Sequence, residues 1–414
     1  MARTLDLRPL AALAALTTTL SACATPANDG VDETTSAETG DPETGAPETE
    51  TGAPETDTET ETGTDTEGDP PRPERLVVTA DWRAKRLSLL DYAALRDGAT
   101  TRDEALWKTI ELPEHEPGPM EVELTPDGSL AVVAVSPGFF GGAVGALVDI
   151  PPGSLPEGGG LLIVDVDSGA IVAELDTAHV PLGIAISPDG KTAWTANYGG
   201  NGESGTSLSQ IDLETLSIAA EFEVGPGPEQ LDLSADGSLG MFNLAGDGTV
   251  VLFDPADPAG TFSNPAEVSD DPSWVLILDD GMDRAVSINS LGPSGYSLLD
   301  IADPQNPVVL DTITTSGVAY AAQPGRTPNE ILLSLYVGDT ASLQMFDVDT
   351  GEIVDQFDLA LSGFAMGLAF EPDDEIALVP MPGANVLVVA DFATGEHREI
   401  AWQDEVGPTY VTLE

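Results

Sequence analysis

One sequence pattern recurs along most of this 414-residue chain. An apolar run leads into a Pro-Asp-Gly or Ala-Asp-Gly turn, and a second apolar run follows. The clearest copies are VELTPDGSLAVVA, IAISPDGKTAWTAN and LDLSADGSLGMFN, at 122–134, 184–197 and 231–243. Because glycine adopts the positive φ that such turns need, each copy predicts two strands joined by a tight turn. Repeated units of this kind must stack, since one unit alone cannot bury its apolar face.

A second marker has the same spacing: an aspartate that ends an apolar strand. It occurs at Asp91, Asp165, Asp212, Asp254, Asp300, Asp347 and Asp391, and the last five intervals are 47, 42, 46, 47 and 44 residues. An Asx-turn explains all of them, because the side chain can accept a hydrogen bond from the backbone that follows. A calcium-loop interpretation of DVDSG and DVDTG is weak, since both lack the ligand series of an EF-hand.

The period and the chain ends together predict the fold. About 45 residues with four strands is one propeller blade, so seven markers predict seven blades. Residues 76–112 hold only three strands, whereas 407–413 (GPTYVTL) resembles the start of a blade such as 227–233 (GPEQLDL). We therefore predict an all-β, seven-bladed β-propeller over 75–414. Its C-terminal strand should close the ring as the innermost strand of the first blade.

The first 22 residues predict a signal peptide. Arg3 and Arg8 precede a short apolar stretch at 10–20, too short to span a bilayer. The stretch ends Leu20-Ser21-Ala22-Cys23, which resembles the lipobox of bacterial lipoproteins. The resemblance implies cleavage before Cys23 and lipid attachment to its sulfur. It also implies an exported protein, anchored by lipid to the bacterial cell envelope at the outer membrane or cell surface. An ordinary signal peptide with an incidental cysteine is the alternative.

Residues 23–74 predict a disordered tether. They are almost entirely Glu, Thr, Gly, Pro and Asp, with no aromatic residue, and such a segment cannot bury enough apolar surface to fold. The whole chain has 14 basic and 72 acidic residues, a net charge of -58. This charge repels phosphate backbones and excludes nucleic acid as a partner. Metal cations, cationic ligands and basic protein patches remain, although an acidic surface that serves only solubility explains the same composition.

One repeat unit resembles a known family. SPDGKTAWTANYGGN, at 187–201, is similar to the YVTN-type β-propeller repeat, whose units combine SPDG, an aromatic-rich strand and an Asn-containing loop. The similarity extends over 76–414 only in period and turn chemistry. It implies a propeller fold and, since one fold hosts many functions, it implies no particular reaction.

Two candidate sites lie in loops between second and third strands. An insertion at about 137–160 carries Phe139 and Phe140 among many glycines. Long loops in compact domains often serve as lids or docking sites, but a tolerated insertion is an equal alternative. The next blade has Asn197, Tyr198 and Asn201 at the equivalent place. These residues could hydrogen-bond a ligand, although a simple turn explains them better.

A third candidate is a histidine pair. His115 and His179 each precede the first strand of a blade, so we expect them on adjacent blades near the channel entrance. With nearby carboxylates they could bind a divalent cation or serve acid–base chemistry. Against this, neither histidine falls in a ligand-spacing motif.

The function that the sequence favours is binding. It has no Cys-x-x-Cys-His, no phosphate-binding nucleotide loop and no Gly-x-Ser-x-Gly. We expect a non-catalytic binding or scaffold propeller without a cofactor, whose partner is an unidentified protein or small molecule at the envelope. The alternative is a lactonase-like hydrolase or metal-dependent enzyme with its site at the channel mouth.

Overall fold

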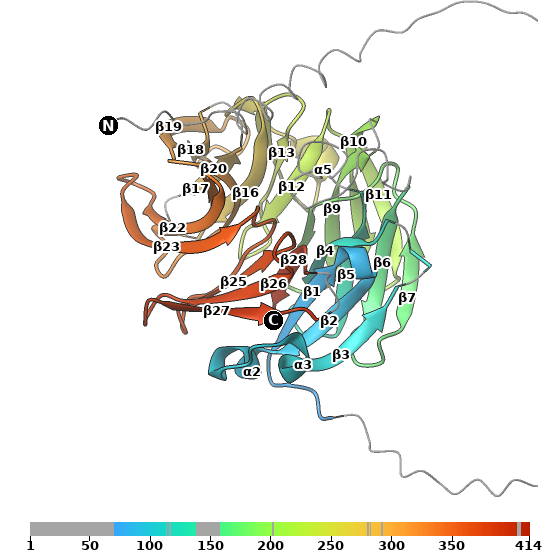
Figure 1. Cartoon of the computed structure of the whole chain (residues 1–414). Coiled ribbons are helices and arrows are strands. Elements are labelled where there is room, and N and C mark those ends of the chain that lie inside the picture. Colours follow the sequence, from blue (N-terminus) through green and yellow to red (C-terminus); the bar gives the residue numbers. More distant parts are fainter. Residues whose placement is uncertain are drawn as a thin grey trace, which may run out of the picture. The chain divides into compact units, whose positions relative to one another are not determined.

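Seven four-stranded antiparallel sheets make up the part of the chain that the computed structural model describes. The described residues are 70–112, 114–115, 117–137, 158–200, 203–279, 281, 283–290, 293–403 and 407–414. Residues 72–414 form one compact unit, and the other unit is 1–71. First strands of neighbouring sheets contact one another all the way round, so the sheets close into a ring. The fold is the predicted seven-bladed β-propeller (Figure 1).

The strands of each blade are given from the innermost outward. They are β28 (Tyr410–Leu413), β1 (Leu76–Asp81), β2 (Arg86–Asp91) and β3 (Leu106–Glu111) in the first blade; β4 (Pro119–Leu124), β5 (Leu130–Val135), β6 (Gly160–Asp165) and β7 (Ile171–Leu175) in the second; β8 (Ile184–Ile186), β9 (Thr192–Gly200), β10 (Glu203–Asp212) and β11 (Ser217–Glu223) in the third; and β12 (Pro228–Leu233), β13 (Gly240–Leu244), β14 (Thr249–Phe253) and β15 (Ala266–Glu267) in the fourth.

The remaining three blades follow the same order. They are β16 (Pro272–Leu278), β17 (Arg284–Asn289), β18 (Gly295–Asp300) and β19 (Val308–Thr314) in the fifth; β20 (Val318–Pro324), β21 (Glu330–Val337), β22 (Thr340–Asp347) and β23 (Ile353–Ser362) in the sixth; and β24 (Ala369–Glu371), β25 (Ile376–Met381), β26 (Val386–Asp391) and β27 (Glu396–Ala401) in the seventh. The described helical segments are η1 (Trp82–Ala84), α2 (Tyr92–Asp97), α3 (Arg102–Ala105) and α5 (Pro258–Thr261), and none of them is long enough to cross a bilayer.

The ring closes where the sequence predicted. β28 pairs antiparallel with β1, with Tyr410 opposite Ala80 and Leu413 opposite Val77, and Figure 1 shows the two strands side by side. Glu414 strengthens this seam, since its Oε1 accepts a hydrogen bond from Arg72 Nη2 at 2.8 Å and its Oε2 accepts one from Leu76 N at 3.1 Å. The two ends of the propeller sequence are therefore locked into one sheet.

The middle strands account for the apolar runs of the sequence. Every residue of β1, β14, β17 and β25 is buried, because each of these strands has a neighbouring blade on both faces. The outermost strands differ: β11 alternates between exposed and half-buried residues, as expected for a strand with one face toward water. Within one blade, a continuous apolar run in the sequence therefore indicates a middle strand, and an alternating run indicates the outermost strand.

The predicted turn chemistry is confirmed. All seven marker aspartates accept hydrogen bonds from backbone N–H groups two or three residues later. At Asp91 the acceptor caps helix α2, so this marker leads into a short helix rather than a hairpin. In the Pro-Asp-Gly turns, Gly128 and Gly190 have φ of 65° and 70°, the values for which glycine was expected.

One local expectation is wrong. Asn197 and Tyr198 were assigned to a loop, but both lie inside β9, which runs on to Gly200. β9 and β10 continue as a hairpin beyond the usual blade length, and Gly200 pairs with Glu203. The extended hairpin requires glycine at position 205, because the two backbones approach closely there: a Cβ at Gly205 would lie 1.8 Å from the carbonyl oxygen of Asn197.

Candidate functional site

The two histidines contact the outer strands of their blades. His115 Nε2 lies 3.9 Å from Glu174 Oε1 on β7. His179 Nε2 lies 3.3 Å from Thr206 Oγ1 on β10, and that hydroxyl donates to Glu223 Oε2 at 2.7 Å. Each histidine thus has its own separate partner. Over the described ranges, no group of three His, Cys, Asp or Glu side chains is arranged to hold a metal ion.

The other sequence candidates have different surroundings. Asn197 is fully buried, and its Nδ2 donates to Ser207 Oγ at 2.9 Å and Ser209 Oγ at 2.8 Å. It therefore belongs to the interior of the third blade. Tyr198 packs against the main apolar core, and burial, with the charges of Glu229 and Asp271, raises the pKa of its phenol. Cys23, Phe139, Phe140 and Asn201 lie outside the described residues.

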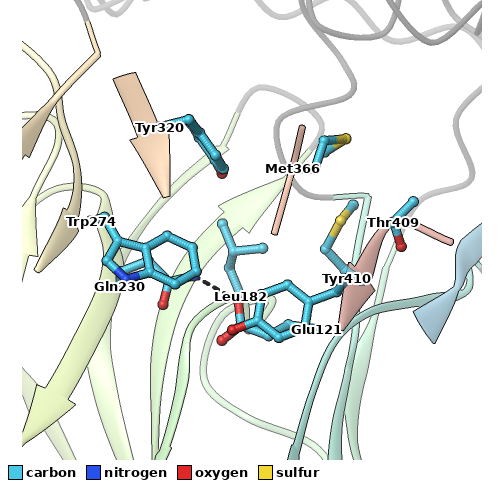
Figure 2. A pocket seen from close by; sticks show the side chains of 9 residues that line it. Glu121, Leu182, Gln230, Trp274, Tyr320, Met366, Thr409 and Tyr410 are labelled. Carbon is cyan, nitrogen blue, oxygen red and sulfur yellow. Dashed lines mark hydrogen bonds between the residues drawn. The ribbon is translucent and has the colours of Figure 1, made fainter. Parts of the chain in front are cut away.

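A pocket lies at one end of the central channel, and all seven blades line it (Figure 2). The enclosed part of the space is small, about 10 Å³, which is room for one water-sized group, and its mouth is open to solvent. Its lining residues stand at or just before the starts of the innermost strands, so the pocket faces the loops that join blades. They are Met120, Glu121, Leu182, Gln230, Trp274, Tyr320, Met366, Thr409 and Tyr410. The pocket is thus on the face opposite the Pro-Asp-Gly turns.

Strand register explains why these residues meet. Four lining residues occupy the same position of the repeat, three residues before an apolar residue that pairs with the second strand of the blade. They are Glu121, Gln230, Trp274 and Tyr410. Those pairs are Leu124 with Ala131, Leu233 with Gly240, Ile277 with Ala285, and Leu413 with Val77. The residues one position earlier include Met120, Tyr320, Met366 and Thr409. Two adjacent positions of the repeat therefore build the whole pocket.

Three aromatic rings form one part of the pocket wall. Trp274 and Tyr410 are nearly parallel, with ring centroids 6.3 Å apart and planes at 19°. Tyr320 meets Trp274 edge-on, with centroids 6.3 Å apart and planes at 66°. These side chains come from β16, β28 and β20, so rings from three blades converge although they are far apart in sequence.

Glu121 supplies a carboxyl group at the bottom of this wall. It is 2 % exposed, and its Oε1 and Oε2 accept hydrogen bonds from Ile184 N at 2.9 Å and Gln230 Nε2 at 2.6 Å. Burial raises its pKa well above the usual value, and the nearby charge of Glu123 adds to the effect. The two accepted hydrogen bonds oppose this rise, but desolvation is the larger cause.

Besides Glu121, four more carboxyls stand on or next to the innermost strands β4, β12 and β16. Glu123 accepts from Tyr410 Oη at 3.0 Å and from Thr412 Oγ1 at 2.8 Å, and burial raises its pKa to about 7. Burial likewise raises the pKa of Glu229 well above its usual value, and the pKa values of Asp232 and Asp271 to about 6. We call these five residues the channel carboxyls.

The charged neighbours of the channel carboxyls are themselves acidic. Glu123 acts on Glu121, Asp232 on Glu123, and Asp271 on Glu229, in each case raising the pKa of the affected carboxyl. None of the nine residues that line the pocket is basic. Arg75 pairs with Glu371 and lines a second pocket together with Glu123, toward the other ends of the innermost strands. The lining of the channel pocket is accordingly aromatic and acidic, with no basic side chain among its nine residues.

Sequence reasoning missed this pocket, although the repeat contained the signal. Aligning MEVEL at 120–124 with EQLDL at 229–233 and TYVTL at 409–413 places polar and aromatic residues at matching inner-strand positions. Such residues are unexpected at the start of a strand buried on both faces. The same comparison would not have found Leu182 or Met366, because apolar residues at these positions look like ordinary core.

Comparisons with known proteins identify the fold alone. No protein-family model and no curated protein matches this chain. A functionally unknown protein from Desulfotomaculum acetoxidans has a similar structure, with a TM-score of 0.62 and 15% identity over 82% of this chain and 98% of that one. Kuenenia stuttgartiensis hydrazine synthase gives a TM-score of 0.52 and 17% identity over 67% and 77%, and U3-55K gives 0.53 and 10% over 69% and 82%. The chain is thus similar in structure to proteins of unknown or unrelated function.

Proposed function

We propose that this chain is an exported, lipid-anchored envelope protein whose propeller binds a ligand in the channel pocket without catalysing a reaction. The pocket carries the proposal. Ligand sites are concave, largely apolar and furnished with a few converging polar groups. The space around Trp274, Tyr320 and Glu121 has this kind of lining, and its small enclosed part suits one group of a ligand whose remainder stays at the open mouth. The ligand is a small molecule or a side chain presented by a partner protein.

The rigid support of the pocket favours binding. Its walls are innermost strands of a closed ring, and most of its lining residues are nearly inaccessible to water. A site built on strands loses little conformational entropy when a ligand enters, because its side chains are already held by packing. Gly183 shows how tight that packing is, since a Cβ there would lie 2.7 Å from Gln230 Oε1 and 2.6 Å from the carbonyl oxygen of Glu229.

A binding screen on the full-length protein tests the proposal. We expect at least one of three sets of small molecules (neutral, anionic and cationic) to raise the unfolding temperature. Trp274→Leu should abolish the rise, whereas Trp107→Leu, which removes a tryptophan from outermost strand β3, should not. Lactone hydrolysis that is lost in Trp274→Leu would instead favour the enzyme alternative. No stabilisation by any set would contradict ligand binding at the pocket.

The anchor is tested separately. We expect Cys23→Ala to move the protein from the membrane fraction to the soluble fraction, because no sulfur remains to carry lipid, while the propeller still folds. Ala22→Gly is the matched control, since it keeps a small residue before the cysteine and should leave the protein in membranes. A Cys23→Ala protein that still needs detergent for extraction would contradict lipid anchoring.

A further inference from the structure

We infer that the channel pocket receives a small organic cation, an ammonium or methylated ammonium group, against Trp274, Tyr320 and Tyr410 with Glu121 as its counter-charge. This inference rests on the proposed function and names the ligand class of the same pocket. It depends on three features: the aromatic wall, the uncompensated carboxyls, and the chemistry of the other lining atoms.

The aromatic wall favours a cation. The face of an aromatic ring is electron-rich and attracts a cation within about 6 Å of its centroid, most strongly when water is excluded. Trp274, the best ring type for this contact, is 7 % exposed, and Tyr410 is 5 % exposed. Figure 2 shows Trp274 and Tyr320 on one side of the space, with Met366 and Thr409 on the other. A group in this space therefore meets aromatic rings and a thioether, which suit a diffuse positive charge.

Among the described residues, no basic side chain is a cause of the pKa shift of Glu121 or Glu229. Both donors to Glu121 are neutral, a backbone N–H and the amide of Gln230. Tyr320 Oη, 3.5 Å from Glu229 Oε1, is also neutral. Burial of a carboxylate is costly unless an opposite charge compensates it, so a bound ammonium would favour ionisation of Glu121.

The same arrangement disfavours a metal ion. Calcium needs six to eight oxygen ligands and magnesium a nearly ideal octahedron. Here both oxygens of Glu121 already accept hydrogen bonds, and Trp274, Leu182 and Met366 present no hard ligand. An alkylammonium asks less, because it needs one nearby negative charge and apolar or aromatic contact for its methyl groups.

Cation binding must also release protons. Glu121 faces Glu123 on its own strand, Glu229 and Gln230 on β12, Tyr320 on β20 and Tyr410 on β28. Burial raises its pKa, so without a ligand it holds its proton at higher pH than an ordinary glutamate. A cation favours the ionised form and expels that proton, and affinity should therefore rise with pH.

The experiment compares choline with 3,3-dimethylbutan-1-ol, its uncharged isostere, in calorimetric titrations of the full-length protein. Methylammonium, tetramethylammonium, acetate and Ca²⁺ complete the series. We expect choline or a smaller ammonium to bind at least about tenfold more tightly than the isostere, which corresponds to about 1.4 kcal/mol. Its affinity should increase as the pH rises above the usual glutamate range, because ionised Glu121 becomes more abundant.

Variants locate the bound cation. Glu121→Gln should weaken ammonium binding about tenfold and flatten its pH dependence, because it keeps the shape of the side chain but removes the charge. Glu352→Gln removes one charge from an exposed position and should change neither. Trp274→Leu provides a second route if Glu121→Gln fails to fold.

Three outcomes overturn the inference. They are equal affinity for the neutral isostere, tighter binding of Ca²⁺ or acetate than of any ammonium, and ammonium binding that survives both Glu121→Gln and Trp274→Leu. In the first two cases a ligand still occupies the pocket, so the proposed function stands while its cationic class fails. If no compound of any charge binds, both fail together.

Discussion

Glu123 and Asp127 stand four residues apart at the two ends of one strand–turn segment, yet their carboxyl groups respond to the protein in opposite ways. Glu123, on the innermost strand β4, is half-buried, and burial raises its pKa to about 7. Asp127, in the following turn, has its pKa lowered because Ser129 N, Ser129 Oγ and Thr125 Oγ1 all donate to it. Local donors favour the charged form, whereas burial favours the neutral form.

The same contrast in pKa separates two sets of acidic residues, those in the turns and those in the channel. Hydrogen bonds lower the pKa values of the turn aspartates, which we define as Asp127, Asp165, Asp189, Asp212, Asp236 and Asp347. Burial raises those of the five channel carboxyls. The turns use their charge to shape the backbone, and the channel carboxyls are held in a place that the fold alone does not require. This difference is why we assign function to the channel and structure to the turns.

The largest expected effect comes from removing β28. Deleting residues 408–414 takes away the ladder with β1, the stacking of Tyr410 on Trp274 and both side-chain donors to Glu123. We expect a loss of about 5 kcal/mol or more, comparable to the whole stability of a typical domain. Urea unfolding followed by tryptophan fluorescence measures it, and an unchanged midpoint would contradict closure of the ring by this strand.

Thr412→Val is the milder form of the same change. It keeps β28 in place and removes only one donor to Glu123, so it should cost about 1 kcal/mol. If the deletion and Thr412→Val were equally destabilising, the seam would depend on this one hydrogen bond rather than on the strand.

The next effect distinguishes the channel carboxyls from the turn aspartates by the pH dependence of the unfolding free energy. The pKa of Glu123 is about 7 in the folded protein against its usual 4.5. Between these two pH values the folded state therefore binds more protons than the unfolded state. The protonated Glu123 side chain contributes stability that is complete below pH 4.5 and is lost as the pH rises through 7. Since Glu123 is partly exposed, we expect about 2 kcal/mol, less than the ~3 kcal/mol of the full shift.

Glu123→Gln tests this sign. Glutamine cannot ionise, so we expect the variant to match the natural protein at pH 5 and to exceed its unfolding free energy at pH 8 by about 2 kcal/mol. Urea unfolding at both pH values gives the answer. A difference that is the same at pH 5 and pH 8 would show that burial does not raise the pKa of Glu123.

The sequence predicted more of the fold than of the site. The repeat, its Asp-Gly turns and the matching ends at 76–112 and 407–413 were sufficient for seven blades and for closure by β28, because turn chemistry is local. The extension of β9 through Tyr198 was missed, since it depends on pairing with β10 and on close backbone contact at Gly205.

The pocket was missed for a different reason. Glu121, Trp274, Tyr320 and Tyr410 are brought together only when the ring closes, and their spacing in sequence spans almost the whole propeller. The histidines attracted attention by residue type, but residue type does not reveal direction: His115 and His179 contact outer strands. Repeat-equivalent positions on the innermost strand were the better guide, because they map directly onto one layer of the channel.

The smallest effect belongs to the turns. Asp127→Ala removes the acceptor for Ser129 N at 3.0 Å, Ser129 Oγ at 2.7 Å and Thr125 Oγ1 at 2.7 Å. We expect a loss of about 1 kcal/mol in urea unfolding, because water replaces most of these bonds in an exposed turn. Asp127→Asn keeps a side-chain carbonyl oxygen and should lose less. Because Asp127 stays ionised at pH 5 and pH 8, the loss should be equal at both, unlike that of Glu123→Gln. A loss that changed between these two pH values would mean that turn and channel carboxyls titrate together, and the separation of structure from function would fail.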